Sequence, residues 1–208
     1  MNTIKQVRWQ EELKTDNTVI LKYDIRFPQM TQSTYRLGQE IFNQYNEQVA
    51  KRLQQRAQTT LFEEAKQLYQ YNKEHGYPVM VYEVILTDTI TYHDETIISL
   101  YSDQYEYTGG ANGTTTRVAQ NWNLPIGRQI PLYQLFPQDP YFLLAIFKQI
   151  QEQVQASPAS YFENACCLAI QTFHPSQYYL TKEGIDVFFQ VYDIAPHSSG
   201  IPVFSIRR

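Results

Sequence analysis

The sequence predicts an α+β fold, a mostly antiparallel sheet with one long and one or two shorter helices packed on it. Apolar and polar residues alternate at several places, most clearly over residues 19–27, and this is the period of a half-buried strand. One amphipathic stretch without proline, from Ser33 or Thr34 to about Lys73, predicts a long helix. Residues 101–136 combine β-branched and aromatic runs with closely spaced turn residues, which predicts a β-meander.

Length and composition predict one globular domain. Of the 208 residues, 43% are hydrophobic and 18% are charged, values typical of a folded protein with a substantial core. We expect a single domain over residues 1–208. Within it, a helix and meander subregion covers about 14–135, and a C-terminal helix and strand subregion covers about 136–208.

The first strands precede the long helix. Residues 4–13 are expected to form a short strand or a pair of strands. In the run 19–27, Val19, Leu21 and every second residue after them are apolar, so one face is buried. Because proline has no N–H to donate, we expect Pro28 to end this strand.

The long helix is predicted from an apolar stripe in which most residues recur every four positions. Its members are Leu37, Ile41, Tyr45, Val49, Leu53, Ala57, Leu61, Ala65 and Leu68. A helix has 3.6 residues per turn, so a four-residue spacing drifts around its axis, and we expect a break or bend near residues 58–60. The stripe lacks the heptad of a coiled coil and favours a helix packed across a sheet.

The remaining elements follow from the same patterns. A central strand is expected at 79–89, apolar on both faces at its start. The meander is expected to close on Ile130, Leu132, Leu135 and Phe136. The other predicted elements are strands at 91–107, 114–118, 178–180, 185–194 and 203–206, helices at 141–155 and 160–172, and a loop at 195–200.

Charge and cysteine content exclude several classes of protein. The net charge is −4 and no basic stripe is visible, so neither nucleic acid nor an anionic membrane surface is an expected partner. No apolar run approaches the length of a membrane span, and residues 1–10 lack the apolar core of a signal peptide. Cys166 and Cys167 are adjacent, which disfavours a disulfide and does not match zinc-ligand spacing. Their apolar surroundings predict buried packing thiols.

We find no catalytic constellation and expect no catalytic residue, metal or cofactor. The four histidines are scattered and match no ligand or base motif. Asp103 and Glu106 point to opposite faces of one strand, so they cannot flank one glycosidic bond together. Folding could still bring Asp103 to Asp186 or Asp193, and Arg117 is a candidate ion-pair partner for the strand carboxylates.

Two loops are the candidate contact sites, since tyrosines beside polar loops can stack on sugar rings or anchor a protein partner. The glycine-rich loop at 109–113 has no helix N-terminus after it, so we interpret it as a turn and not as a phosphate-binding loop. The candidate residues of the two loops are Tyr105, Tyr107, Gly109, Gly110 and Asn112 in the first, and Tyr192, Asp193, Pro196 and His197 in the second.

Two motifs carry a resemblance to a known family. The first is YTGGANGTTTR, followed by IPLYQLF, and the second is FHPSQYYLTKEGIDVFFQVYDIAPHSSGIPVFSI. Together they make the chain, from about Val19 to Ile206, resemble a bacterial domain of unknown function. That domain forms the extracytoplasmic part of a lysozyme-sensing anti-sigma factor and the N-terminal half of a peptidoglycan deacetylase. Asn112 stands where the family usually has histidine, and His197 where it usually has tyrosine.

The resemblance does not imply one shared activity. Together with the absence of a catalytic constellation, it favours a non-enzymatic recognition domain at the bacterial surface that binds a wall hydrolase of the lysozyme type or a peptidoglycan fragment. One alternative is an enzyme that acts on the carbohydrate of peptidoglycan, with carboxylates brought together by folding. Another is a cytoplasmic or spore-associated structural protein, since residues 1–10 lack a signal-peptide pattern. The family points to an extracytoplasmic location, and the oligomeric state is left open.

Overall fold

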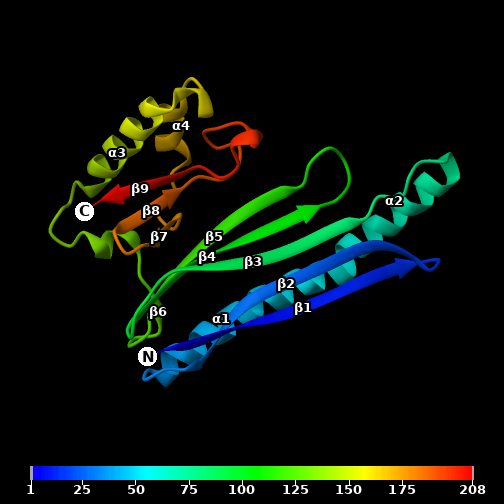
Figure 1. Ribbon diagram of the computed structural model, residues 1–208, viewed down its shortest axis with the longest axis horizontal. Coiled ribbons are helices and arrows are strands. Elements are labelled where there is room, and N and C mark those ends of the chain that lie inside the picture. The colour runs from blue at the N-terminus through cyan, green and yellow to red at the C-terminus, as the bar shows by residue number, and fades with distance from the viewer. Residues whose placement is uncertain (1, 208) are drawn as a thin grey trace. The chain divides into compact units, whose positions relative to one another are not determined.

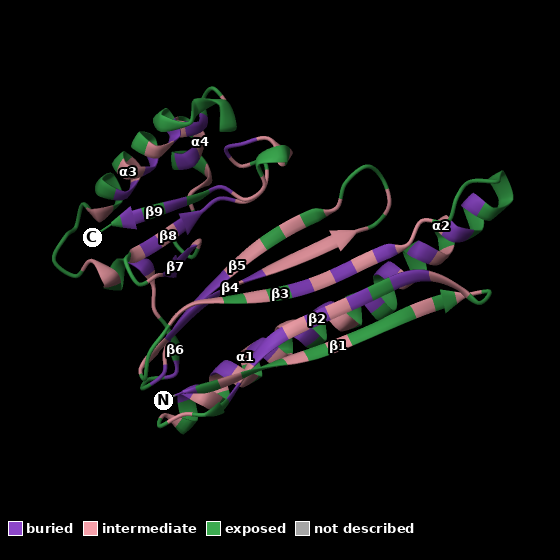
Figure 2. Cartoon of the chain, viewed as in Figure 1, coloured by how far each residue is buried: buried purple, intermediate pink, exposed green. Residues whose placement is uncertain are grey.

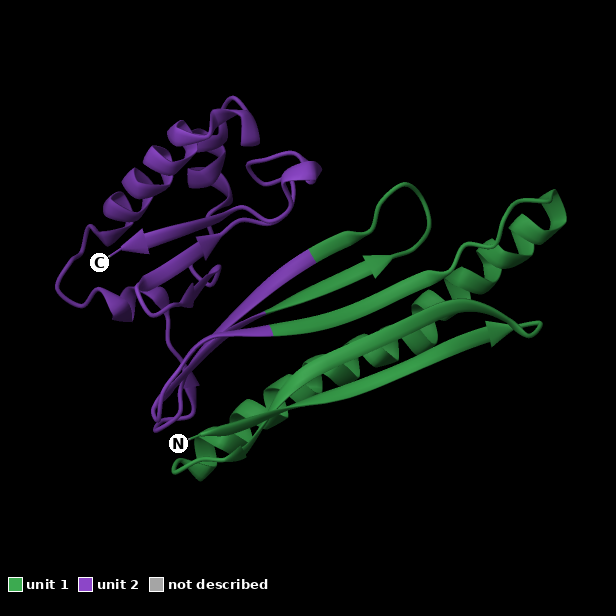
Figure 3. Ribbon diagram, in the orientation of Figure 1, with its two compact units in different colours: residues 1–88, 102–115 green, residues 89–101, 116–208 purple. Residues whose placement is uncertain are grey.

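The computed structural model describes residues 2–207, and its contacts divide the chain into two compact units (Figure 3). Unit 1 consists of Met1–Asp88 and Ser102–Thr115, and unit 2 of Thr89–Tyr101 and Thr116–Arg208. The predicted α+β fold is confirmed, because six strands form one sheet, three form another, and helices accompany them (Figure 1). Each unit has a hydrophobic core of its own. The assignment of the whole chain to one domain stays a prediction.

Unit 1 begins with a long antiparallel hairpin of β1 (Thr3–Thr15) and β2 (Thr18–Gln32). Its two-residue turn places Asp16 and Asn17 at positive φ, as a tight hairpin with right-handed twist requires. Residues 4–13 are thus part of one strand, and the alternation over 19–27 gives a buried face as predicted. The expected stop at Pro28 is wrong. Pro28 lies opposite Gln6 of β1, beyond the stretch of β2 that pairs with β3, so its missing N–H interrupts no pairing with β3.

The long helix is confirmed, together with its predicted irregularity. It comprises α1 (Arg36–Arg56), a π-helical turn η1 (Ala57–Leu61) and α2 (Phe62–His75). The i→i+5 turn is wider than an α-helical turn, so it takes up the angular drift that four-residue spacing would otherwise accumulate. Gly76, at φ 72°, ends α2 in the left-handed conformation typical of a helix C-terminus.

The buried face of the helix differs from the predicted stripe in α1. Leu53, Ala57, Leu61 and Ala65 are buried as predicted. Upstream, however, Leu37 is 63% exposed, and the buried positions lie one residue later, at Gly38, Phe42, Asn46 and Ala50. The step from Ala50 to Leu53 is three residues, which returns the stripe to the face that packs on β2 (Figure 2).

Three strands contribute residues to both units. β3 (Tyr82–His93) runs parallel to β2, with Leu21 opposite Tyr82 and Ile25 opposite Leu86, and the long helix is the crossover between these strands. β4 (Ile97–Tyr107) and β5 (Thr114–Asn123) follow β3 in the sheet, whose order is β1-β2-β3-β4-β5-β6. The predicted strand at 91–107 began too early. Residues 91–93 belong to β3, and Asp94 forms the turn by accepting bonds from the N–H groups of Thr96 and Ile97.

The end of the meander lies in unit 2 and is less regular than predicted. β6 (Arg128–Gln129) has only two residues, and the expected third strand becomes a 3₁₀ helix, η2 (Leu132–Leu135). Pro131 precedes η2 and cannot donate to a ladder, which accounts for the early end of pairing.

The rest of unit 2 consists of helices and a three-stranded antiparallel sheet. The helices are α3 (Phe142–Ala156), η3 (Pro158–Ser160), α4 (Ala165–Thr172) and η4 (His197–Ser199). The strands are β7 (Tyr178–Leu180), β8 (Gly184–Phe188) and β9 (Val203–Arg207), in the order β7-β8-β9. The predicted helix at 141–155, the strand at 178–180 and the edge strand at 203–206 are confirmed.

Two expectations for this region are wrong. The strand predicted at 185–194 ends at Phe188, because the residues after it form a turn in which Tyr192 adopts φ 71°. The expectation of buried cysteines is also wrong, because Cys166 is only partly buried and Cys167 is exposed. Ala165 and Ala169 face the core from α4, and Cys167 lies about 200° around the helix from Ala165, where it is exposed.

A buried network of neutral hydrogen bonds stabilises unit 2. The Ser99 hydroxyl donates to Asn121 Oδ1 at 2.7 Å and accepts from the Leu180 N–H at 2.8 Å. Asn121 Nδ2 donates to the carbonyl of Tyr178 at 2.8 Å. These bonds satisfy polar groups of β4, β5 and β7 that water cannot reach.

Candidate functional site

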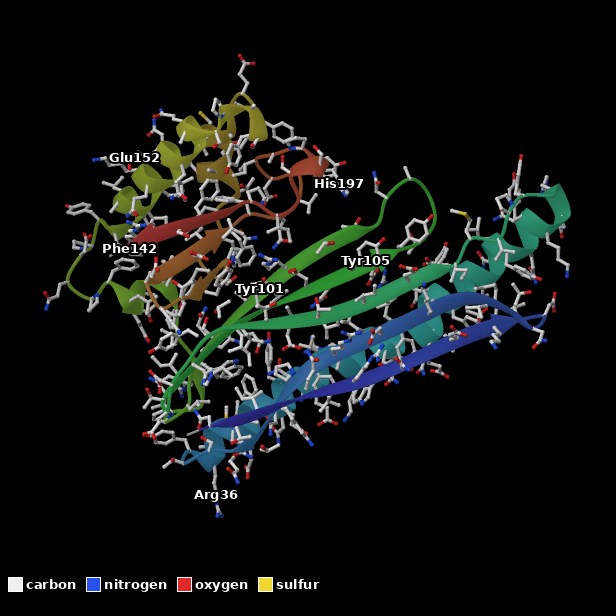
Figure 4. The ribbon with its side chains drawn as sticks, viewed as in Figure 1. Arg36, Tyr101, Tyr105, Phe142, Glu152 and His197 are labelled. Atoms are coloured by element: carbon white, nitrogen blue, oxygen red, sulfur yellow. The ribbon has the colours of Figure 1, made fainter. Side chains whose placement is uncertain are left out.

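The glycine-rich turn of unit 1 is braced by the two tyrosines that precede it. A side chain on Gly113 would lie 2.4 Å from the Tyr105 ring, so glycine is required for the ring to pack there (Tyr105 is labelled on β4 in Figure 4). The Tyr107 hydroxyl donates to the carbonyl of Gly110 at 3.0 Å. Gly109 and Gly110 both have positive φ, and Asn112 is exposed. Both tyrosines therefore shape the loop as well as flank it.

The second predicted loop, in unit 2, is exposed at its tip and anchored at its base. Tyr192 is 62% exposed, and its ring lies 5.5 Å from that of His197 (labelled in Figure 4). Ile194 and Ala195 are fully buried between them, and the Ile194 carbonyl accepts from the Phe162 N–H at 3.0 Å. The predicted residues Tyr192 and His197 are thus brought together.

Side-chain hydrogen bonds hold both ends of this loop. Asp193 Oδ2 accepts from the Gln190 N–H at 2.8 Å and closes the turn on which Tyr192 lies. The Gln190 amide accepts from the Arg117 N–H at 3.0 Å and donates to the Arg117 carbonyl at 2.8 Å. Pro196 precedes η4, and the Ser199 hydroxyl bonds the carbonyl of Ser160 at 2.8 Å. Gln190, which the sequence did not single out, is therefore central to the loop's position.

The base of the loop lies beside an aromatic group. The Arg117 guanidinium stands 3.7 Å from the centroid of the Tyr101 ring, in cation–π geometry. Tyr101 packs on Tyr179, and Tyr179 on Phe188, at centroid distances of 5.0 and 6.2 Å. Burial is the main cause that raises the pKa of Tyr179, with the nearby Asp186 carboxylate also contributing.

Several carboxylates of unit 1 pair with arginine or lysine, and Glu11 accepts from neutral side chains instead. Glu106, for which Arg117 was a candidate partner, instead accepts a bidentate bond from Arg56 at 3.0 Å. A groove of about 610 Å³ contains Glu11, Glu12, Asp24 and Glu83 among its lining residues. Bonds from Arg8 and Arg26 lower the pKa of Asp24 to about 2, and bonds from Tyr23 and Gln58 lower the pKa of Glu11. A general acid needs a raised pKa, so these two carboxyl groups are shifted in the opposite direction.

A cavity of about 640 Å³ lies entirely within unit 2. Its lining residues come from β5 and β6, from η2 and the start of α3, and from residues 173–178, which lead into β7. Phe142, labelled at the start of α3 in Figure 4, forms part of its wall. None of the nine predicted contact residues lines it, because its wall combines segments up to about 60 residues apart in sequence, which no local pattern relates.

Two other features are absent from residues 2–207. No group of three or more His, Cys, Asp or Glu side chains is arranged there to hold a metal ion. No helix in this range has the length and apolar character needed to cross a membrane.

Comparison with protein families confirms the resemblance drawn from the two motifs. Residues 14–115 match the family described as "Deacetylase PdaC", and residues 134–208 match the "Protein of unknown function (DUF3298)". No curated protein matches the chain.

Solved structures share the fold of the whole chain. A member of the DUF3298 family from Bacteroides fragilis NCTC 9343 superposes with a TM-score of 0.75 at 16% identity, covering 99% of this chain and 90% of that one. A DUF3298 family protein from Pseudomonas aeruginosa PAO1 gives 0.62 at 14% identity, covering 100% and 91%. The chain is therefore similar to PdaC in its first half and to DUF3298 in its C-terminal third, and it has the fold of DUF3298 proteins.

Proposed function

We propose that this protein is a non-enzymatic recognition protein of the bacterial cell envelope, acting outside the cytoplasm, and that its partner is a wall hydrolase of the lysozyme type. The observation that carries the proposal is the loop at residues 192–200. It presents Tyr192 and His197 side by side at the surface while Ile194 and Ala195 anchor it in the core. A loop fixed before binding loses little conformational entropy on association, as in inhibitors that insert a rigid loop into an enzyme cleft.

The chemistry of the loop favours a protein cleft as the binding surface. Tyrosine contributes a large contact area with a polar tip and is enriched among residues that dominate interface energies. The loop carries no lysine or arginine, and Asp193 is occupied in closing its turn. Contact would therefore rest on aromatic packing and hydrogen bonds.

Isothermal titration calorimetry with a chicken-type lysozyme, and separately with soluble muropeptides, tests the proposal. We expect lysozyme to bind, and Tyr192→Ala with His197→Ala to weaken binding about tenfold or more, as expected for central aromatic contacts. Tyr141→Ala is the matched control, because Tyr141 is 72% exposed elsewhere in unit 2. If only muropeptides bind, the partner is a peptidoglycan component and not a hydrolase. If neither lysozyme nor muropeptides bind, the proposal is contradicted.

A further inference from the structure

The cavity of unit 2 has the dimensions and composition of a small-molecule site. Its volume of about 640 Å³ lies within the range of roughly 300–1,000 Å³ that is typical of ligand pockets. Leu132, Phe142 and Phe173 contribute apolar surface, while Gln129, His174 and Ser176 add neutral polar groups. A mostly apolar wall with a few polar groups is the usual construction of such sites.

The wall of the cavity is held in place by contacts outside it. The Phe142 ring stacks on Phe136 at 4.8 Å, and Phe173 meets Phe147 edge to face at 5.2 Å. Elsewhere in the lining, the Tyr178 hydroxyl donates to the Ile130 carbonyl, and Asn121 is fixed by the buried network of unit 2. The cavity is therefore preformed and does not depend on a ligand for its shape.

The lining residues select against a charged ligand. They include no aspartate, glutamate, lysine or arginine. A charged group entering an apolar cavity loses its hydration, and here no opposite charge on the wall compensates. A neutral ligand incurs no such cost.

The polar groups of the cavity are matched to an amide. The Ser176 N–H donates to His174 Nδ1 at 3.3 Å, and the Ser176 hydroxyl lies 2.7 Å from the same nitrogen. Because Nδ1 accepts the N–H, the proton of the neutral imidazole lies on Nε2, and the Ser176 hydroxyl is the donor in its bond to Nδ1. His174 Nε2–H can then donate to a carbonyl oxygen, and the lone pairs of Ser176 Oγ can accept from an N–H. The carboxamide of Gln129 adds one further donor and acceptor, and all three polar residues are exposed and so lie where the cavity meets solvent.

We propose that this cavity binds a neutral molecule in which a secondary amide is attached to an apolar or ring-shaped body. The aromatic wall packs on the body, and His174 and Ser176 bond the amide carbonyl and N–H. Two sources offer this chemistry, an N-acetylated amino sugar and a capped hydrophobic amino acid. The site is independent of the loop at residues 192–200, which shares no residue with it, so either can fail while the other holds.

Titrations monitored by ¹⁵N NMR and calorimetry test the cavity with N,N′-diacetylchitobiose and with N-acetyl-phenylalanine methylamide. Cellobiose, with hydroxyl groups in place of the acetamido groups, and the methyl ester of O-acetyl-phenyllactic acid, with esters in place of both amides, are the matched compounds that contain no amide. We expect one of the two amide probes to shift the backbone signals of Gln129, His174 and Ser176. We also expect Ser176→Ala to weaken binding about threefold, since the hydroxyl that accepts from the amide N–H is lost while water can still reach this exposed position.

Adjacent residues of α3 provide a blocking variant and its control. Leu143 lines the cavity and is 37% exposed, so Leu143→Trp can fill the entrance without disturbing the core. Leu144 is 68% exposed and is not among the lining residues, so Leu144→Trp should bind normally. Undisturbed NMR spectra of the free variants confirm folding. Binding of neither amide probe, equal binding of the amide-deficient analogues, or binding unchanged by both Leu143→Trp and Ser176→Ala would overturn the proposal.

Discussion

The two units of this protein use polar side chains in different ways. Unit 1 carries exposed ion pairs on its strands and helices, among them Arg8 with Asp24 and Arg56 with Glu106. Buried asparagines of unit 1, such as Asn46 and Asn72, bond backbone carbonyls, whereas unit 2 has a network of buried side-chain bonds between three strands, centred on Asn121, and an apolar cavity beside it. Exposed ion pairs contribute little and are screened by salt, whereas a buried neutral bond is costly to break because its partner is left without water. Substitutions in the network around Asn121 should therefore cost more than substitutions in the exposed ion pairs.

The largest expected effect comes from a core residue of unit 2. Phe204 is fully buried against Phe189, and Phe204→Ala should lower the free energy of unfolding by about 3–5 kcal/mol through lost burial and the cavity left behind. Hydrogen exchange with mass spectrometry shows whether β2 and α1 of unit 1 lose protection together with unit 2. Val203→Ala, at a position that is 36% exposed on the same strand, should cost less than about 1 kcal/mol. If Phe204→Ala also cost less than about 1 kcal/mol, the placement of Phe204 in the core of unit 2 would be contradicted.

The buried network gives the next largest effect. Asn121→Ala removes a partner from the Ser99 hydroxyl and the Tyr178 carbonyl, and should lower the free energy of unfolding by about 2–3 kcal/mol. Urea unfolding followed by tryptophan fluorescence, with Trp9→Phe as the background so that Trp122 alone reports, measures the loss. Asn123 is the matched control two residues along β5. Its Oδ1 is buried without a hydrogen-bond partner among residues 2–207, so Asn123→Ala should cost much less. Equal losses for the two variants would show that the network does not stabilise unit 2.

Removing the Asp24 carboxylate, which pairs with Arg8 and Arg26 in unit 1, should lower stability less, and the loss should depend on pH. The pKa of Asp24 is lowered from 3.8 to about 2 by the bonds from Arg8 and Arg26. Because the pKa of this carboxyl is lower in the folded than in the unfolded protein, the ionised group stabilises the fold at pH values above the unfolded-state pKa. This stabilisation is lost as the pH falls from about 4 towards 2. Asp24→Asn should therefore remove about 1 kcal/mol at neutral pH and almost nothing near pH 2.

Urea unfolding at several pH values measures this difference, and added salt should reduce it. Asp16→Asn is the control, because Asp16 and its partner Lys73 are both about 60% exposed and should contribute less. A difference between Asp24→Asn and the parent protein that is constant from neutral to acid pH would contradict the assigned pKa.

The smallest expected effect tests which face of α1 is buried. Leu37 lies on the predicted apolar stripe but is 63% exposed, so Leu37→Ala should change the free energy of unfolding by no more than about 0.5 kcal/mol. Phe42 is fully buried on the same helix, so Phe42→Ala should lower the free energy of unfolding several times more than Leu37→Ala does. Thermal and urea unfolding of both variants measure this contrast. Comparable losses of stability would show that Leu37 is buried, as the predicted apolar stripe requires.

Local patterns predicted most elements of the fold, and they failed where another segment decides the conformation. The four-residue spacing around Ala57 predicted an irregular turn in the helix, and the π-helical turn η1 lies there. The apolar run after Phe188 looks like a continued strand, but the backbone turns at Tyr192. Asp193 and Gln190 stabilise this turn, and Gln190 does so through Arg117, which is 73 residues away in sequence. No local periodicity contains that bond.

The sequence by itself determined the α+β class, the length of the helix, the positions of the two candidate loops and the resemblance to a family. Each of these depends on spacing within a short segment, and the chain's own geometry converts such spacing into a strand face, a helix stripe or a turn. Only the tertiary structure decided which side of α1 is buried, how Tyr192 and His197 meet, and that a neutral cavity forms in unit 2. These features arise when distant segments pack together, and the free energy of that packing depends on all of them at once.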